Sequence, residues 1–175
     1  MIAIDLRELE RGDLSRLNTW RNDPEVIRLL GANFLFIGAA IDEQWFASYL
    51  GTRASAVRLA IVVSTSNLCI GMVNLTSIHA INRSAEFSIM LGDKDYWSQG
   101  VGQQATARML RHGFADLNLH RIHLTVLADN ARARRLYQRF GFREEGVQRD
   151  AVYKEGKFCD LVTMSLLKAE FHDDK

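Results

Sequence analysis

A glycine-containing turn at the head of a helical pattern is the stretch of this chain best suited to bind a ligand. The turn contains Gly100 and Gly102 and leads into apolar residues that recur every three or four positions up to Leu117. The first amides of a helix lack partners within it, and the helix dipole adds positive potential there. An ordinary junction between loop and helix would also explain the glycines. We predict an anion site, best suited to phosphate, on the amides of Gln99, Gly100, Val101, Gly102, Gln103 and Gln104.

Charged side chains are distributed unevenly along the chain. Between Gly100 and Arg143 the sequence holds eight arginines and only two acids, an excess that suits a polyanionic ligand. The arginines are Arg108, Arg111, Arg121, Arg132, Arg134, Arg135, Arg139 and Arg143. The first fifty residues hold five arginines and eight acids, which would suit a cationic ligand or simply form a solvated surface. These acids include Asp23, Glu25, Asp42 and Glu43.

The composition fits a single domain that spans residues 1–175. Hydrophobic residues make up 47% of the chain, and the net charge of +1 disfavours nucleic-acid-binding and membrane-surface proteins. The amino terminus shows no signal-peptide pattern and no apolar run has transmembrane length, so we expect a cytoplasmic protein. Cys69 and Cys159 lie in apolar strand-like segments, and the five histidines lack metal-site spacing, so no metal is expected.

Strands and helices must position the glycine turn. Alternating and β-branched patterns predict strands at residues 2–6, 58–63, 68–75, 85–91, 120–127, 143–152 and 157–167. Helical spacing predicts helices at residues 14–20, 24–30, 42–50, from the glycine turn to 117, and 130–140. Asp13 and Asp42 are expected to cap two helices and Leu50 to face inward. This order indicates an α/β fold with a mixed, mostly antiparallel central sheet flanked by helices and one β-α-β crossover.

Two motifs together resemble those of one enzyme family. Gln99-Gly100-Val101-Gly102 is followed, after one strand, by Asn130-x-x-Ala133-x-x-Leu136-Tyr137-x-x-x-Gly141-Phe142. This arrangement resembles the GCN5-related N-acetyltransferase (GNAT) superfamily from about residue 85 to 167. Trp20-Arg21-Asn22-Asp23-Pro24 and Ala85-Glu86-Phe87 are similar to the branch that contains ribosomal-protein and spermidine N-acetyltransferases. The family often has Gln or Arg where this chain has Trp97, which removes one possible contact with the cofactor.

The resemblance implies acetyl-CoA as co-substrate, with its pyrophosphate on the amides of the glycine turn. Asn130 and Arg135 would be further cofactor contacts, although Asn130 is also a preferred helix cap. The strand that carries Ile89, Met90 and Leu91 would splay from its neighbour, and its main chain would pair with the pantetheine arm. Core packing of these side chains is compatible with that role. The amide of Met90 or Leu91 would stabilise the oxyanion.

Tyr137 and Glu86 are the catalytic residues that the resemblance implies. Tyr137 would donate a hydrogen bond or proton to the departing thiolate, because its ordinary pKa of about 10 lies above that of a thiol. At helical spacing, Tyr137 could instead be a core aromatic. Glu86 would take the proton of the amine, directly or through water, because a lone acid on a central strand is costly to bury unless used or paired. A salt bridge to an arginine such as Arg83 would equally explain Glu86.

The sequence therefore predicts an N-acetyltransferase that moves acetyl from acetyl-CoA to a primary amine by direct attack. The acceptor would be a protein N-terminus or a polyamine such as spermidine, with an amino sugar as the alternative. A non-catalytic acyl-CoA-binding regulatory module would carry the same features. A dinucleotide-binding oxidoreductase would need a third glycine where Ala105 stands. The exposed edges of the last hairpin would allow a homodimer.

Overall fold

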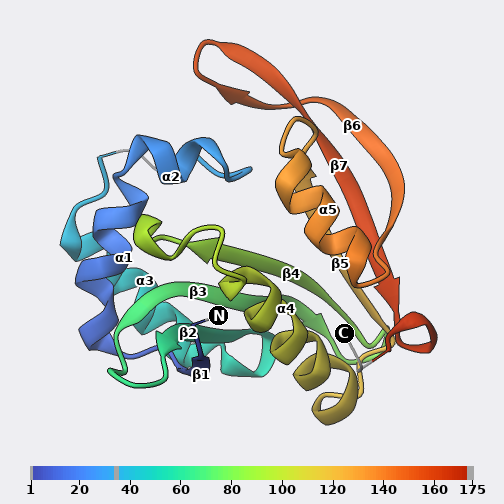
Figure 1. Ribbon diagram of the computed structural model, residues 1–175, viewed down its shortest axis with the longest axis horizontal. Helices are drawn as coiled ribbons and strands as arrows, with labels where there is room; N and C mark the ends of the chain where they lie inside the picture. The colour runs from blue at the N-terminus through green and yellow to red at the C-terminus, as the bar shows by residue number, and fades with distance from the viewer. Residues whose placement is uncertain (1, 34–35, 173–175) are drawn as a thin grey trace.

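A seven-stranded sheet in the order β1-β2-β3-β4-β5-β7-β6 organises the chain (Figure 1). The computed structural model describes residues 2–33 and 36–172. The strands are β1 (Ile4–Glu8), β2 (Val57–Val63), β3 (Cys69–His79), β4 (Ser84–Leu91), β5 (Arg121–Leu127), β6 (Arg143–Lys154) and β7 (Lys157–Leu167). The helices are α1 (Leu14–Arg21), α2 (Pro24–Arg28), α3 (Ala39–Gly51), α4 (Val101–Arg111) and α5 (Ala131–Arg139). The predicted α/β class and order of elements are confirmed. None of the described helices is long and apolar enough to cross a bilayer.

The sheet opens between β4 and β5, as the resemblance implied. These two strands are parallel neighbours joined through α4, and they pair only from Ser84 to Glu86 against Arg121 to His123. Beyond this point β4 stays paired with β3 as far as Leu91, while β5 stays paired with β7. The two strands therefore diverge toward their carboxyl ends, which Figure 1 shows as a widening V.

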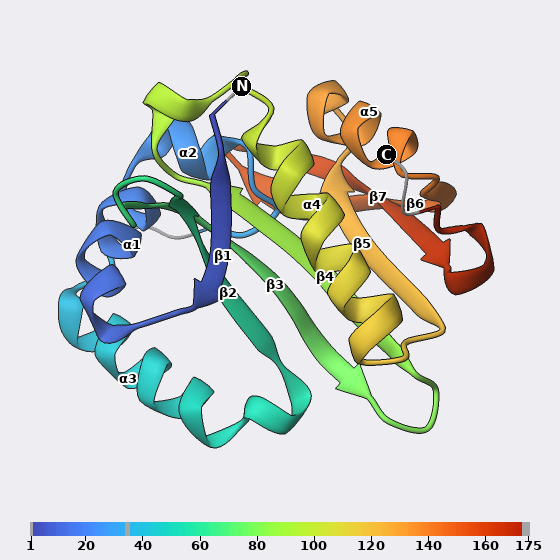
Figure 2. The same cartoon turned by 60° about the horizontal axis from the view of Figure 1, so that its bottom comes forward.

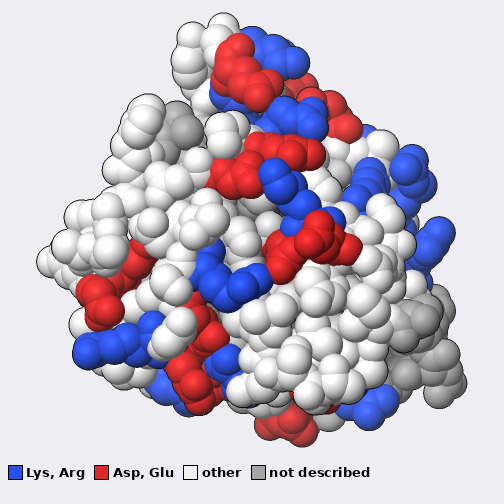
Figure 3. Space-filling view, turned by 60° about the vertical axis from the view of Figure 1, so that its left-hand side comes forward, with Lys and Arg blue, Asp and Glu red and all other residues white. Residues whose placement is uncertain are grey.

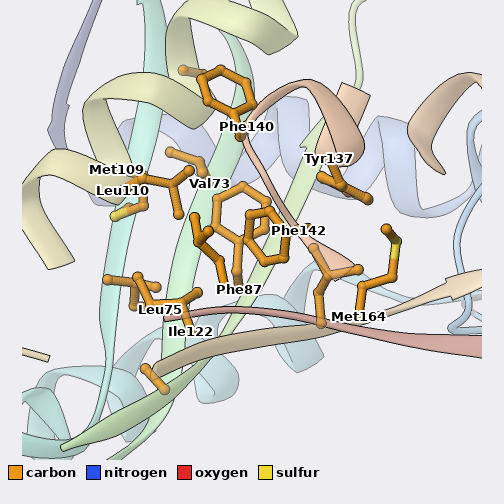
Figure 4. Packing of buried hydrophobic residues seen from close by; sticks show 14 of the residues in the cluster. Val73, Leu75, Phe87, Met109, Leu110, Ile122, Tyr137, Phe140, Phe142 and Met164 are labelled. Carbon is orange, nitrogen blue, oxygen red and sulfur yellow. The ribbon is translucent and has the colours of Figure 1, made fainter. Parts of the chain in front are cut away.

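Two hydrophobic cores lie on opposite faces of the sheet. One packs α4 and α5 on the sheet, and the other packs α1, α2 and α3 on its reverse (Figure 2). Side chains of β4 alternate between the cores, with Phe87 in the first and Met90 in the second. In the first core the rings of Phe87 and Phe142 have centroids 6.5 Å apart, and Tyr137 lies beside both (Figure 4).

Two of the predicted helix caps are wrong, because tertiary ion pairs take the carboxylates instead. The Asp13 side chain does not cap α1 but binds Arg7, with Nη1 2.8 Å from Oδ2. The helix α3 starts at Ala39, so Asp42 lies inside its first turn, where it is buried against Arg21. Leu50, which was expected to face inward, is 53% exposed.

The hairpin of β6 and β7 extends beyond the sheet and reaches toward α2 (Figure 1). Its turn is at Glu155 and Gly156, and both have positive φ. Lys154 anchors the hairpin tip, because its Nζ donates hydrogen bonds to the carbonyls of Ile27 and Ala32 at 3.0 and 3.1 Å. The hairpin is thereby attached to the N-terminal region. The edge strand β6 is largely exposed, and the homodimer stays a prediction.

Candidate active site

A cavity of about 1330 Å³ opens where β4 and β5 separate. Its wall includes Ile89 and Leu91 from one face of β4, and Ser88 and Met90 from the other. The cavity therefore passes from one side of the sheet to the other. Because ligand pockets commonly measure about 300–1,000 Å³, this space is large enough for a long cofactor arm together with a second small molecule.

The glycine turn lies on the cavity wall. Gly100 precedes α4 with φ of 81°, a left-handed conformation that glycine adopts without strain. Val101, Gly102 and Gln103 are the first three residues of α4, so their amides have no carbonyl partner within the helix. The amide of Gln104, in contrast, already donates to the Gly100 carbonyl at 3.1 Å. The free donors of the turn therefore end at Gln103, one residue earlier than predicted.

The side chains of Gln99 and Gln104 point away from the cavity, and neither residue lines it. Gln99 Nε2 donates to the Asp95 carbonyl at 2.5 Å, and Gln104 Nε2 donates to the Ile2 carbonyl at 2.8 Å. Trp97, the departure from the family pattern, fixes the turn to the end of β4, since its indole N–H donates to the Leu91 carbonyl at 2.7 Å. These bonds hold the turn in place from outside the cavity.

Positive charge lies beside the glycine turn. Arg132, Arg135 and Arg139 are exposed on α5, line the cavity and have no ion pair among the described residues. Their spacing of three and four residues places them on one side of α5. A Cβ built on Gly102 would lie 3.7 Å from Leu136 Cδ2, so the start of α4 packs directly on α5. Free amides and guanidinium groups without an ion pair thus fit a diphosphate, and the contact of Arg135 with the cofactor stays a prediction.

The end of β4 leaves main-chain groups facing the gap. The Gly92 amide donates to the Ile70 carbonyl at 3.1 Å, and Leu91 is in register with Gly71. In an antiparallel ladder, the residues whose backbone N–H and C=O groups point at the partner strand alternate with residues whose groups point away from it. Because the Gly92 amide points at β3, the backbone groups of Met90 also face β3, and those of Ile89 and Leu91 face the gap. Of the two amides predicted as oxyanion donors, Leu91 is therefore the better placed.

Tyr137 belongs to both the core and the cavity wall. Only 7% of its surface is exposed, and its ring centroid lies 6.0 Å from that of Phe87 and 5.8 Å from that of Phe142. Burial raises the pKa of its phenol to about 12. With this pKa the phenol is protonated at neutral pH. Because the hydroxyl makes no hydrogen bond with the described residues, it is available to a ligand.

Glu86 lines the cavity from the opposite face of the sheet. Among the described residues it has no ion pair, so the alternative of a salt bridge to Arg83 is not seen. Its register neighbours are Thr76 on β3 and His123 on β5, and His123 Nδ1 is buried without a partner. Glu86 is therefore a carboxylate that lines the cavity without an ion pair among the described residues.

Asn130 lies on the wall but uses its side chain within the protein. Its Oδ1 accepts from the Ala133 amide at 3.1 Å and so caps α5, while Nδ2 donates to the Leu29 carbonyl at 3.1 Å. Both interactions hold α5 against the N-terminal region. A direct contact between Asn130 and a cofactor stays a prediction.

The far side of the cavity contains residues that were not predicted to belong to the site. They are Arg21, Trp45, Arg58 and Asn74, from α1, α3, β2 and β3. The available signal was a polar residue inside an otherwise apolar strand, as for Arg58 in Val57–Val63 and Asn74 in Cys69–His79.

The acids expected to attract a cationic ligand do not line this cavity. Asp23 and Glu25 both pair with Lys94, and Glu43 pairs with Arg11. On the surface in Figure 3, acidic and basic side chains mostly lie next to one another. The N-terminal excess of acid is therefore largely neutralised within the protein. No group of three metal-binding side chains occurs in the part of the chain that the structure describes.

Comparison with known proteins agrees with this geometry. The acetyltransferase (GNAT) domain family matches residues 4–143. The chain is 30% identical to a spermidine N(1)-acetyltransferase of Vibrio cholerae over 96% of this chain and 95% of that protein. It is 34% identical to a putative ribosomal N-acetyltransferase of Bacillus subtilis over 62% of this chain and 58% of that protein.

A solved structure matches nearly the whole chain. The crystal structure of spermidine N-acetyltransferase from Vibrio cholerae in complex with CoA and spermine superposes with a TM-score of 0.89 at 28% identity. The match covers 95% of this chain and 96% of that one. The chain therefore belongs to the GNAT family and is an acetyl-CoA-dependent N-acetyltransferase.

Proposed function

We propose that this enzyme transfers acetyl to a primary amine by direct attack, with the two reactants entering from opposite faces of the sheet. The observation that carries this proposal is the cavity through the sheet, whose wall includes Tyr137 on the α5 side and Glu86 on the other. The amides of the glycine turn and the arginines of α5 would hold the diphosphate of acetyl-CoA. The gap beside Ile89 and Leu91 would hold the pantetheine arm.

The reaction forms a nitrogen–carbon bond and breaks the carbon–sulfur bond of a thioester, which bound acetyl-CoA supplies. Glu86 accepts the proton that the amine loses, directly or through water. The Leu91 amide donates to the carbonyl oxygen as negative charge develops on it. Tyr137 donates its hydrogen bond or proton to the departing sulfur, because burial keeps the phenol protonated.

A covalent acetyl-enzyme is not part of this proposal. Cys69 is buried, and burial raises the pKa of its thiol to about 11, so it is a poor nucleophile at neutral pH. Neither Cys69 nor Cys159 lines the cavity. Initial-rate measurements should therefore give intersecting rather than parallel double-reciprocal lines when both substrates are varied. Parallel lines, or an acetylated cysteine in a quenched reaction, would contradict direct attack.

The names of the relatives support a polyamine and a protein N-terminus as the first acceptors to test. Release of the CoA thiol should be measured with spermidine, N-terminal peptides, amino acids and amino sugars. Turnover with at least one of these amines is expected. Tight binding of CoA without turnover of any amine would instead indicate a non-catalytic CoA-binding module.

A further inference from the structure

The half of the cavity that faces α1, α2 and α3 carries positive charge. Its charged side chains are Arg21, Arg28, Arg58 and Glu86. Asp42 already balances Arg21, so among the described residues of the wall Glu86 is the acid left to balance Arg28 and Arg58, and a polyamine would bring in further positive charge. Since like charges close together repel, this wall favours an acceptor with a negative group.

Arg58 and Arg28 both lack a counter-ion among the described residues, but Arg28 is exposed to solvent whereas Arg58 is partly buried. The guanidinium carbon of Arg58 lies 5.1 Å from the ring centroid of Trp45 and 5.7 Å from that of Tyr49, so two aromatic side chains hold it in place. Its Nε is buried without a hydrogen-bond partner, and no carboxylate of the described residues pairs with it. Burial lowers the pKa of Arg58, yet a guanidinium stays charged at neutral pH. Arg58 is partly buried, and a partly buried charge is stabilised when a ligand of opposite charge pairs with it.

Arg21, the neighbouring arginine, differs in this respect. It is buried against Asp42, and Asn18 Nδ2 donates to the same carboxylate at 2.7 Å. Its guanidinium carbon lies 4.3 Å from the Trp45 ring centroid, so Arg21 and Arg58 contact the same indole. Because Asp42 already binds Arg21, the positive charge of Arg58 is left without an internal partner.

Asn74 supplies an unused hydrogen-bond acceptor beside Arg58. The two residues are register partners on β2 and β3, and strands lie about 4.8 Å apart. Asn74 is 4% exposed, and its Nδ2 donates to Ser88 Oγ at 3.0 Å. Its Oδ1 is buried without a partner although the residue lines the cavity. A carbonyl oxygen in this position suits the N–H groups of an amine.

We propose, resting on the acetyl transfer proposed above, that the acceptor is a small aminocarboxylate whose carboxylate binds Arg58. The planar guanidinium matches a carboxylate in geometry and charge. The amine of the same molecule lies toward Asn74 and Glu86, nearer the gap between β4 and β5. Arg58 is then the residue that selects an anionic amine over a polyamine.

The first test compares acceptors that differ only in the carboxylate. Amino acids, with β- and γ-amino acids as longer members, are assayed for CoA release beside their carboxamides and spermidine. We expect kcat/KM to be at least about tenfold higher for the acid than for its amide, the range of a charge-assisted hydrogen bond. The preferred chain length reports the distance between the amine and the carboxylate.

The second test removes the proposed contact. Arg58→Gln should raise KM for the preferred acid by about 10- to 100-fold, with a smaller change in kcat and no change for its carboxamide. Arg58→Lys should recover part of the affinity because it keeps the charge. Arg149→Gln, an exposed arginine on β6, is the matched control and should behave as wild type. Melting temperature and acetyl-CoA affinity establish that each variant is folded.

Three outcomes would overturn this inference. The first is a higher kcat/KM for a carboxamide or for spermidine than for the acid. The second is an equal loss of kcat/KM for the acid and its carboxamide in Arg58→Gln. The third is calorimetry on the CoA-saturated enzyme in which the acid binds no more tightly than its carboxamide. The calorimetric arm does not require turnover. Failure of every amine to release CoA, with the acid still bound through Arg58, would instead contradict the proposed acetyl transfer.

Discussion

Replacing Tyr137 with phenylalanine removes one hydroxyl group from the wall of the cavity. The packing of the ring on Phe87 and Phe142, at 6.0 and 5.8 Å, is available to phenylalanine as well. The hydroxyl makes no hydrogen bond with the described residues, so its removal leaves no internal partner unsatisfied. We expect the free energy of unfolding to change by less than about 1 kcal/mol. The melting temperature should then move by no more than about 4 °C.

The same change should strongly reduce the rate of acetyl transfer. General acid catalysis contributes about 10²- to 10⁴-fold, so kcat should fall about 100-fold or more. A 100-fold loss corresponds to about 2.7 kcal/mol of transition-state stabilisation. Acetyl-CoA affinity should stay within about twofold, because the proposed phosphate contacts are the amides of the glycine turn and the exposed arginines of α5, not the phenol of Tyr137.

The pH dependence gives an independent measure of the same group. Since burial raises the pKa of Tyr137 to about 12, the phenol stays protonated over the whole range in which the protein can be assayed. An exposed phenol would lose its proton near its ordinary pKa of about 10. The wild-type kcat should therefore show no loss attributable to this group between about pH 8 and pH 10.5.

Single-turnover measurements with acetyl-CoA and a saturating acceptor separate chemistry from product release. Tyr153→Phe serves as the matched control, because Tyr153 is 54% exposed on the β6–β7 hairpin. A kcat for Tyr137→Phe within about threefold of wild type in the chemical step would refute the role of the phenol. A melting temperature that falls by about 10 °C would refute the reasoning on packing.

Three further predictions concern the turn, the sheet surface and the hairpin. Gly100→Ala forces a side chain into a left-handed conformation, with a strain of about 1–3 kcal/mol, and calorimetry should show weaker acetyl-CoA binding. Arg121 lowers the pKa of Glu145 to about 2. The pair therefore stabilises the fold fully at a pH above the ordinary pKa of a glutamate, and this stabilisation is lost as the pH falls toward the lowered pKa. Arg121→Gln should therefore show a smaller decrease in melting temperature than wild type between about pH 6 and pH 3, a modest effect at this exposed site. Lys154→Met should lower the urea midpoint and increase hydrogen exchange in the hairpin tip, because it leaves buried carbonyls unpaired, and unchanged exchange would contradict the anchor.

Local interactions explain what could be predicted from the sequence. The spacing of apolar residues reports which face of a strand or helix is buried, so the order of elements and the β-α-β crossover were predictable. The free amides at Val101 and Gly102 were also predictable, because every helix leaves its first donors without internal partners. Tyr137 and Glu86 were predicted through motif resemblance, and both line the same cavity, from opposite faces of the sheet.

The tertiary structure decided where the charges are neutralised. Asp42 looked like a helix cap and a cation site, but it lies buried against Arg21, a residue distant in sequence. Arg58 and Asn74 are polar residues in apolar strands, and only the register of β2 with β3 brings them together. Sequence alone determined the elements and the free amides of the glycine turn, because those depend on near neighbours in the chain. The sign of the charge on the cavity wall proposed to face the acceptor depends on contacts between segments that are distant in sequence. Only the packing of the folded chain determines those contacts.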